Sequence, residues 1–223
     1  MRKYRSNAAS DVRVAYGVEL VAGLQSFSET AAHAASFEVL NDELDAAYQK
    51  RIQLRKPSLK KRAAFRFAQY ETDQVIRMFH RAMEIADGGR KHGPIAEFLF
   101  PDGLSPVVAP FGERQIAPTE ELIGRVTRCK VPGSEGLCLE WQPKLEASLA
   151  KLRLAADEHK ATRKAHIEAF QDEVALRSEH YMAVDKLMGC VRTAFPNDRG
   201  RQDLIFPVVD DGGDDDPPEE GKE

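Results

Sequence analysis

The chain has 223 residues, which is long enough for one sizeable hydrophobic core or two small ones. Hydrophobic residues make up 42% of it and charged residues 30%, a composition that argues against a membrane protein and against a largely disordered chain. The net charge of −4 is unevenly spread. Residues 208–223 hold eight acidic side chains and one basic side chain, −7 in total, so the other residues carry +3.

The first ten residues, MRKYRSNAAS, are basic and are not followed by an apolar run, so we expect no signal peptide and a flexible N-terminus over residues 1–10. No apolar run approaches the roughly 20 residues that span a bilayer. The three cysteines are odd in number and lack C-x-x-C spacing, which argues against a disulfide framework or a zinc ribbon. We therefore expect reduced thiols and a cytoplasmic protein.

Residues 11–56 predict one long helix, because proline is absent and the apolar side chains follow a helical stripe. Pro57 predicts the end of that helix, and Ser58 can cap the next one. Residues 59–86 then show a core seam with alternating three- and four-residue spacing, made of Phe65, Ala68, Thr72, Val75, Phe79, Ala82 and Ala86. Gly88 and Gly89 predict where this second helix stops.

The segment FLFPDGLSPV, residues 98–107, is apolar and rich in turn-forming residues. Phe98, Leu99 and Phe100 can bury apolar area, while the Pro-Asp-Gly sequence that follows them favours a turn. Similar Phe-Pro sequences occur at residues 193–196 and 204–207. We interpret these segments as packing corners at helix ends rather than as binding loops.

Residues 118–130 predict a further helix, and the sequence VPGSEG after it predicts a break. Residues 139–193 are again helical in pattern, with Pro143 acceptable in the first helical turn. Two core seams are expected in this stretch. The first consists of Leu145, Leu149, Leu152 and Ala156, and the second of Ile167, Phe170, Val174, Tyr181, Val184, Met188 and Val191.

Several sequence matches recur at an offset of about 101 residues, which indicates an internal duplication. The tetrapeptide Leu44-Asp45-Ala46-Ala47 matches Leu145-Glu146-Ala147-Ser148, and Gly23 matches Gly124. By this correspondence the second repeat turns near residues 157–163. The predicted fold class is all-α: an elongated antiparallel bundle of four main long helices, built as two tandem helical-hairpin repeats with apolar Phe-Pro loops.

The expected domain organisation has four parts. A flexible N-terminus covers residues 1–10, the first hairpin repeat covers 11–110 and the second covers 111–207. Residues 208–223 form an acidic tail that is expected to be disordered, because it offers almost nothing to bury in a core.

The motifs of common catalytic sites are missing from the sequence. It contains no G-x-S-x-G, no G-x-x-x-x-G-K-[ST] loop and no G-x-G-x-x-G loop. No histidine has a glutamate three residues before it, which argues against a ferritin-like metal site. We therefore expect no enzymatic activity, no catalytic residue, no cofactor and no metal site. The pairs Glu29–His33 and His80–Glu84 keep one alternative open, because their i,i+4 spacing could place two metal ligands on one helix face.

Two clusters of basic side chains surround the predicted hairpin turns. In a bundle with both turns at one end, they would form a positive pole able to attract phosphate. The candidate anion-binding residues are Arg55, Lys56, Lys60, Lys61, Arg62, Arg163 and Lys164. Aromatic residues for base stacking are scarce in these clusters, so nucleic-acid binding is an alternative rather than the leading hypothesis.

The leading hypothesis is a non-enzymatic structural or protein-interaction helical bundle, because long helices with core seams suit scaffolding and self-association. Its partner would be an unknown protein or a second copy in a homodimer, and not a membrane. The alternatives are a nucleic-acid or polyanion binder that uses the basic turns, and a bundle that holds a metal or small ligand near His33 and His80. The side chains most expected in the core are Phe65, Phe79, Phe100, Phe170 and Tyr181.

Overall fold

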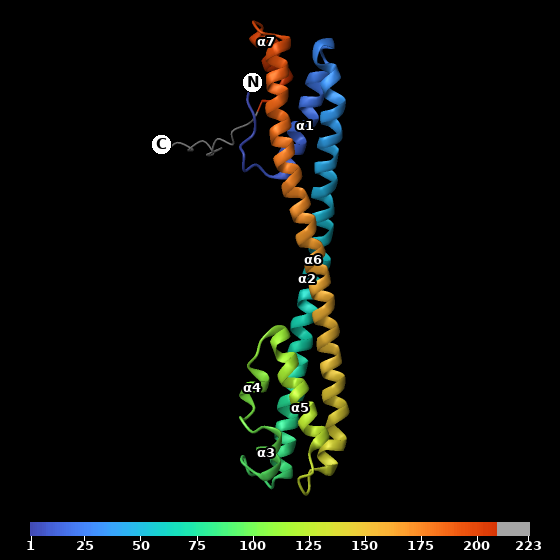
Figure 1. Cartoon of the computed structure of the whole chain (residues 1–223), viewed down its shortest axis with the longest axis vertical. Coiled ribbons are helices and arrows are strands. Elements are labelled where there is room, and N and C mark those ends of the chain that lie inside the picture. Colours follow the sequence, from blue (N-terminus) through green and yellow to red (C-terminus); the bar gives the residue numbers. More distant parts are fainter. Residues whose placement is uncertain (209–223) are drawn as a thin grey trace, which may run out of the picture. The chain divides into compact units, whose positions relative to one another are not determined.

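The computed structural model describes residues 1–208, and these residues form helices and the turns between them (Figure 1). The all-α prediction is confirmed. The helices are α1 (Ser10–Gln25), α2 (Ser28–Ala86), α3 (Pro94–Leu99), α4 (Ser105–Val108), a 3-10 helix (Gly112–Gln115), α5 (Ile116–Arg128), α6 (Glu135–Ala194) and α7 (Arg199–Ile205). The predicted acidic tail, apart from Val208, lies outside the described residues.

The chain packs into two compact units, and each is described by itself. Unit 1 combines Met1–Gln53 with the chain from Ile167 onward, and unit 2 is Leu54–His166. Both units therefore draw on α2 and on α6. The predicted repeats follow one another along the chain, whereas unit 1 combines two separate segments and unit 2 is the continuous segment between them. The duplication rests on sequence matches and stays a prediction.

The four long helices of the predicted bundle are not confirmed, because α2 alone has 59 residues and α6 has 60. The predicted helix end at Pro57 and the predicted turn near residues 157–163 are wrong. Pro57 and Pro143 both lie inside helices. Proline costs a helix the hydrogen bond to the carbonyl four residues earlier. Pro57 and Gln53 are both exposed, so water can satisfy that carbonyl and the helix continues.

A break that the sequence did not mark separates α1 from α2, so the single helix predicted over residues 11–56 is also wrong. Side-chain hydroxyl groups at the break and just after it bond to backbone carbonyl groups of α1. Ser26 Oγ donates to the Ala22 carbonyl at 2.9 Å, and Thr30 Oγ1 donates to the Leu24 carbonyl at 2.8 Å. Such local bonds compete with helix continuation. Phe27, between them, packs its ring against Phe195 with 5.4 Å between centroids.

Helices α2 and α6 run antiparallel, as their side-chain contacts show in each unit. Higher residue numbers on α2 meet lower residue numbers on α6. In unit 1 the pairs are Asn41–His180 at 3.1 Å and Lys50–Asp172 at 3.7 Å, and in unit 2 they are Lys61–Glu158 at 2.7 Å and Thr72–Ser148 at 2.9 Å.

The core of unit 1 is formed by α1, α2, α6 and α7. Its buried side chains include Tyr16, Leu20, Leu24, Phe37, Val184, Val191 and Ile205. Tyr4 packs into the same core with 2% of its surface exposed, although it belongs to the segment expected to be a flexible N-terminus. Phe195 and Phe206 are also buried there, which confirms that the two later Phe-Pro segments are packing corners.

The core of unit 2 is formed by α2 and α6 together with the short helices α3, α4 and α5. It contains Ile76, Phe79, Met83, Leu99, Phe100, Val107, Leu122 and Leu145. The prediction of a packing corner at residues 98–107 is confirmed for Leu99, Phe100 and Val107, whereas Phe98 is exposed. Gly103 makes the turn between α3 and α4 with a φ of 81°, a conformation that favours glycine.

The seam predicted for the second half of α6 is wrong in its first part. Ile167, Phe170 and Val174 are exposed, with Phe170 at 46%, and Tyr181 is only half-buried. The buried positions lie one residue away, at Ala169, Glu173 and His180. Two of these three are polar, so a search for apolar residues finds the neighbouring face of the helix instead.

Two phenylalanines on the long helices test this assignment of buried and exposed faces. Phe79 is fully buried, so Phe79→Ala is expected to lower the free energy of unfolding by about 3–5 kcal/mol. Phe170→Ala is expected to change it by less than about 1 kcal/mol, because its ring already contacts water. Urea denaturation followed by circular dichroism measures both values. Equal losses in the two variants would contradict the assignment.

The matched glycines of the predicted repeat have different surroundings. A Cβ atom added at Gly23 would collide with the backbone of Ile205 in α7, whereas at Gly124 it would meet nothing closer than 3.8 Å. Gly23→Ala is therefore expected to destabilise the protein by about 1–3 kcal/mol, since backbone cannot yield as a flexible side chain does. Gly124→Ala is expected to stabilise it by up to about 1 kcal/mol through higher helix propensity. Thermal unfolding distinguishes them, and a stable Gly23→Ala variant would contradict the close approach of α1 and α7.

Candidate functional site

A cleft between α2 and α6 in unit 2 brings together part of the predicted anion-binding set. Its volume is about 410 Å³. The lining residues are Arg55, Ser58, Leu59 and Arg62 from α2, and His159, Arg163 and His166 from α6. The space lined by these seven residues is called the cationic cleft.

The cleft does not lie at a hairpin turn, since both helices continue through it. The basic hairpin turns predicted from the sequence are therefore absent. The basic residues lie in the middle of α2 and α6 rather than at helix ends. Four of the seven predicted residues do not line the cleft. Lys56 and Lys60 are exposed on α2, Lys61 is held by Glu158 at 2.7 Å, and Lys164 lies on α6 outside the lining.

Sequence reasoning missed the two histidines of the cationic cleft. His159, Arg163 and His166 are spaced by four and three residues, which places them on one face of α6, and this spacing was the available signal. The ring of His159 stacks on buried Phe65, with 5.6 Å between centroids and 20° between planes. His166 Nε2 is shielded from solvent and has no hydrogen-bond partner among the described residues.

The guanidinium groups of Arg55, Arg62 and Arg163 make no hydrogen bond or ion pair with another residue in the described part of the chain. Since no acidic side chain lines the cleft, three unpaired positive charges face one space. The arrangement can attract an anion, and arginine favours carboxylate and phosphate in particular because its planar group donates two parallel hydrogen bonds.

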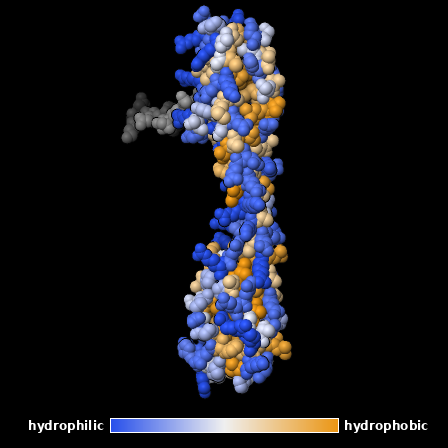
Figure 2. All heavy atoms as spheres, viewed as in Figure 1, coloured by the Kyte–Doolittle hydropathy of each residue, from blue (hydrophilic) through white to orange (hydrophobic). Residues whose placement is uncertain are grey.

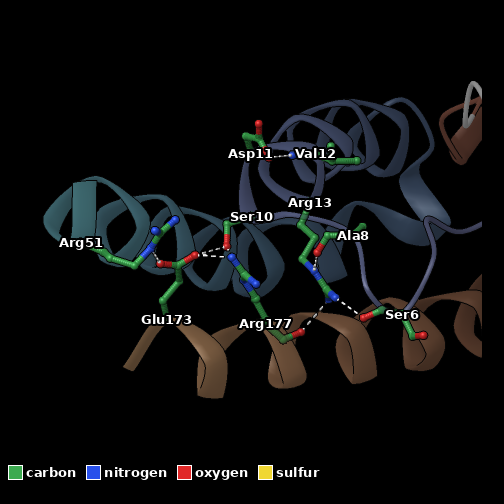
Figure 3. A network of polar contacts seen from close by, with 9 residues as sticks. All are labelled: Ser6, Ala8, Ser10, Asp11, Val12, Arg13, Arg51, Glu173 and Arg177. Carbon is green, nitrogen blue, oxygen red and sulfur yellow. Dashed lines mark hydrogen bonds and ion pairs between the residues drawn. The ribbon is translucent and has the colours of Figure 1, made fainter. Parts of the chain in front are cut away.

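A second polar cluster lies in unit 1, around the fully buried carboxylate of Glu173 (Figure 3). Ser10 Oγ donates to Glu173 Oε1 at 2.6 Å, and Arg177 donates to the same oxygen at 2.5 Å. The other oxygen, Oε2, accepts from Arg51 Nε. Arg177 Nε also donates to Ser10 Oγ at 2.6 Å, which closes the network.

The partners of Glu173 keep it ionised. Burial by itself raises the pKa of this carboxyl group, but the hydrogen bonds from Ser10, Arg51 and Arg177 outweigh burial and hold the pKa below its ordinary value. Both carboxylate oxygens are already engaged by donors. The cluster therefore links α1, α2 and α6 and leaves no free base for catalysis.

Arg13 connects the N-terminal segment to α6 in the same region (Figure 3). It donates to the carbonyl groups of Ser6 at 2.6 Å, Ala8 at 2.9 Å and Arg177 at 2.9 Å. Its guanidinium group also lies 4.8 Å from the centre of the Tyr4 ring, which is within the range of a cation–π contact. These contacts account for the ordered path of residues 4–8.

His180 is fully buried beside this cluster and is neutral. Its Nε2 lies 3.1 Å from Asn41 Oδ1, an oxygen that can only accept, so Nε2 carries the proton. Its Nδ1 then accepts from the Tyr4 hydroxyl at 2.6 Å. Burial, with a further contribution from the Arg13 charge, lowers the pKa of His180 to about 4. Burial likewise raises the pKa of Tyr4 to about 12, so Tyr4 stays a donor.

The residues considered for metal binding are not gathered into a site. Within residues 1–208, no group of three or more histidine, cysteine, aspartate or glutamate side chains is placed to hold a metal ion. His80 Nδ1 lies 3.7 Å from Glu84 Oε1 in unit 2, while His33 is exposed on the part of α2 that belongs to unit 1.

Cys129, Cys138 and Cys190 are free thiols. Burial raises the pKa of Cys138 to about 11, with a smaller contribution from neighbouring Cys129, so Cys138 is a poor nucleophile at neutral pH. Through residue 208, none of the helices has the length and apolar character that crossing a membrane requires.

Comparison of the chain with protein-family models, with characterised proteins and with solved structures gives no match.

The buried His180 predicts a specific loss of stability in acid. Because its pKa is lower in the folded chain than the ordinary 6.5, the unfolded chain binds the extra proton first as the pH falls. The stability that neutral His180 contributes is complete above pH 6.5 and is lost between pH 6.5 and about 4, amounting to about 3 kcal/mol.

Urea denaturation of the natural protein and of His180→Gln at pH 7 and pH 4.5 measures this contribution. The natural protein is expected to lose about 2–3 kcal/mol more than the variant over this interval, because glutamine does not titrate. Imidazole NMR signals of His180 that titrate near pH 6.5 would contradict the buried, neutral assignment.

Proposed function

We propose that the protein is a non-enzymatic structural protein that acts through protein–protein contact, and that it self-associates as a homodimer. The observation that carries this proposal is a second apolar face on α2 in unit 2. A helix that packs one face on a core ordinarily presents polar residues on the other. Here the opposite face presents large apolar side chains to solvent.

Five large apolar residues of α2 form this face, with exposures between 48% and 77%. They are Leu59, Phe67, Tyr70, Met78 and Ile85, named here the apolar stripe. At 3.6 residues per turn they fall within about 100° of one another around the helix. The buried residues Phe65, Thr72, Ile76, Phe79 and Met83 lie on the other side. Figure 2 shows that hydrophobic residues, in orange, lie among hydrophilic ones, in blue, on the visible face of the molecule.

The order of residues along the apolar stripe suits a second copy of the same helix. In an antiparallel pair with its two-fold axis near residue 72, Leu59 of one copy lies at the level of Ile85 of the other. Phe67 then lies within one residue of Met78, and Tyr70 faces Gln74. A two-fold interface uses the same surface on both subunits, so this near-palindromic order favours self-association over an unrelated partner.

The energy available from the apolar stripe indicates a reversible dimer. Full burial of one such side chain is worth about 1.5–3 kcal/mol, and these are 48–77% exposed before association, so ten of them supply on the order of 10 kcal/mol. Association costs about 4–15 kcal/mol. At the lower end of that cost about 6 kcal/mol remains, which corresponds to a Kd of tens of micromolar, so the proportion of dimer is expected to depend on protein concentration in that range.

A cytoplasmic location is part of the proposal. Thiols persist in reducing compartments, and all three cysteines are free in the structure.

Sedimentation velocity tests self-association across roughly 1–100 μM protein. The natural chain is expected to shift from monomer towards dimer over this range, and the double variant Phe67→Glu with Tyr70→Glu to stay monomeric, because two carboxylates would be buried without partners. Val39→Glu is the matched control, since Val39 is an exposed apolar residue of the same helix in unit 1.

The control is expected to dimerise like the natural chain, and circular dichroism confirms that all three proteins are folded. A natural chain that stays monomeric at the highest concentration would overturn the proposal. So would equal dimerisation of the natural chain and the double variant.

A further inference from the structure

We propose that the cationic cleft is a binding site for a small molecule that carries a diphosphate group. The proposal rests on the charge and shape of the cleft and is independent of the proposed self-association. It concerns a ligand, whereas the apolar stripe concerns a second copy of the chain.

The cleft lies in a band of the molecule from which acidic residues are missing. On α2 no aspartate or glutamate occurs between Asp45 and Glu71, and on α6 none occurs between Glu158 and Glu168. Glu158, which precedes His159 of the cleft in sequence, forms an ion pair with Lys61, with 2.7 Å between Oε2 and Nζ. Positive charges brought together without neutralising partners repel one another, and a bound anion relieves this repulsion.

The three arginines are placed to hold two phosphate groups rather than one. Arg55 and Arg62 lie two turns apart on α2, about 10 Å along the helix axis. Arg163 faces them from α6 across the cleft. A guanidinium group binds phosphate through two parallel hydrogen bonds, so donors spread over this length match a diphosphate better than a single phosphate ion.

The two histidines add aromatic rings and ring nitrogens to the lining of the cleft. His159 is held in orientation by its stacking on Phe65, at 5.6 Å between centroids. His166 Nε2, which is shielded from solvent, has no partner within residues 1–208, and a buried nitrogen without a partner is energetically costly. The ring of His166 lines the cleft, so a ligand bound there would lie against it. The volume of about 410 Å³ is that of a site for a small molecule.

Isothermal titration calorimetry of the full chain with inorganic pyrophosphate tests the site. Two double variants remove the same charge. The first, Arg62→Gln with Arg163→Gln, changes two residues that line the cleft. The second, Lys56→Gln with Lys60→Gln, changes two exposed residues of α2 that do not line the cleft. All four positions are exposed, so folding is expected to survive, and thermal unfolding verifies this.

The natural chain is expected to bind pyrophosphate at one saturable site. The arginine variant is expected to bind at least about tenfold more weakly, since it loses direct charged hydrogen bonds. The lysine variant should weaken binding by no more than about twofold, because it removes only long-range attraction that salt screens. Equal weakening would show a diffuse positive surface and overturn the proposal, as would the absence of saturable binding.

A second measurement keeps the proposal falsifiable if an arginine variant misfolds. In the natural chain, pyrophosphate is expected to shift the imidazole NMR signals of His166, which lines the cleft, and to leave those of His33 in unit 1 unchanged. Unchanged His166 signals at saturating pyrophosphate would overturn the proposal.

Discussion

The antiparallel packing of α2 against α6 is the contact on which both units depend. Two helices bury only one stripe against each other, and the sides of that stripe stay open to water unless other elements cover them. In unit 1, α1 and α7 provide this cover through side chains such as Leu20, Leu24 and Ile205. In unit 2, the short helices α3, α4 and α5 do so through Leu99, Val107 and Leu122. The same long pair therefore serves two separate cores.

Buried polar side chains in unit 1 favour one alignment of the packed helices. Glu173 and His180 sit at positions of α6 where an apolar residue would bury more easily, yet each is fully hydrogen-bonded. Their partners come from the N-terminal segment, α1, α2 and α6 itself. Sliding α6 by one turn would leave a buried carboxylate without donors, which costs far more than misplacing an aliphatic side chain. The network consequently favours one alignment of the helices.

The surface of α2 in unit 2 carries two features that lie outside the hydrophobic core of the unit. The apolar stripe leaves Phe67 and Tyr70 in water, and the cationic cleft leaves Arg55 and Arg62 without partners. Leu59 belongs to both features, so a second copy bound at the stripe would lie beside the cleft. The two proposals remain separable, because one depends on apolar area and the other on charge.

The sequence by itself determined the all-α class, the helix end at Gly88 and Gly89, and the apolar corners around Phe100, Phe195 and Phe206. These features follow from local chemistry: helical periodicity, the conformational freedom of glycine, and apolar residues beside proline. The basic character of residues 55–62 was equally visible. What the sequence could not determine was how far each helix continues and which face it buries.

Tertiary structure decided those points. Pro57 stays inside α2 because Pro57 and Gln53, whose carbonyl it leaves unbonded, are both exposed residues, and packing rather than sequence decides that exposure. The buried face of α6 passes through Glu173 and His180 because partners distant in sequence satisfy them, so Phe170 is left exposed. The cationic cleft, likewise, exists only because antiparallel pairing sets Arg163 and His166 of α6 opposite Arg55 and Arg62 of α2, more than a hundred residues earlier.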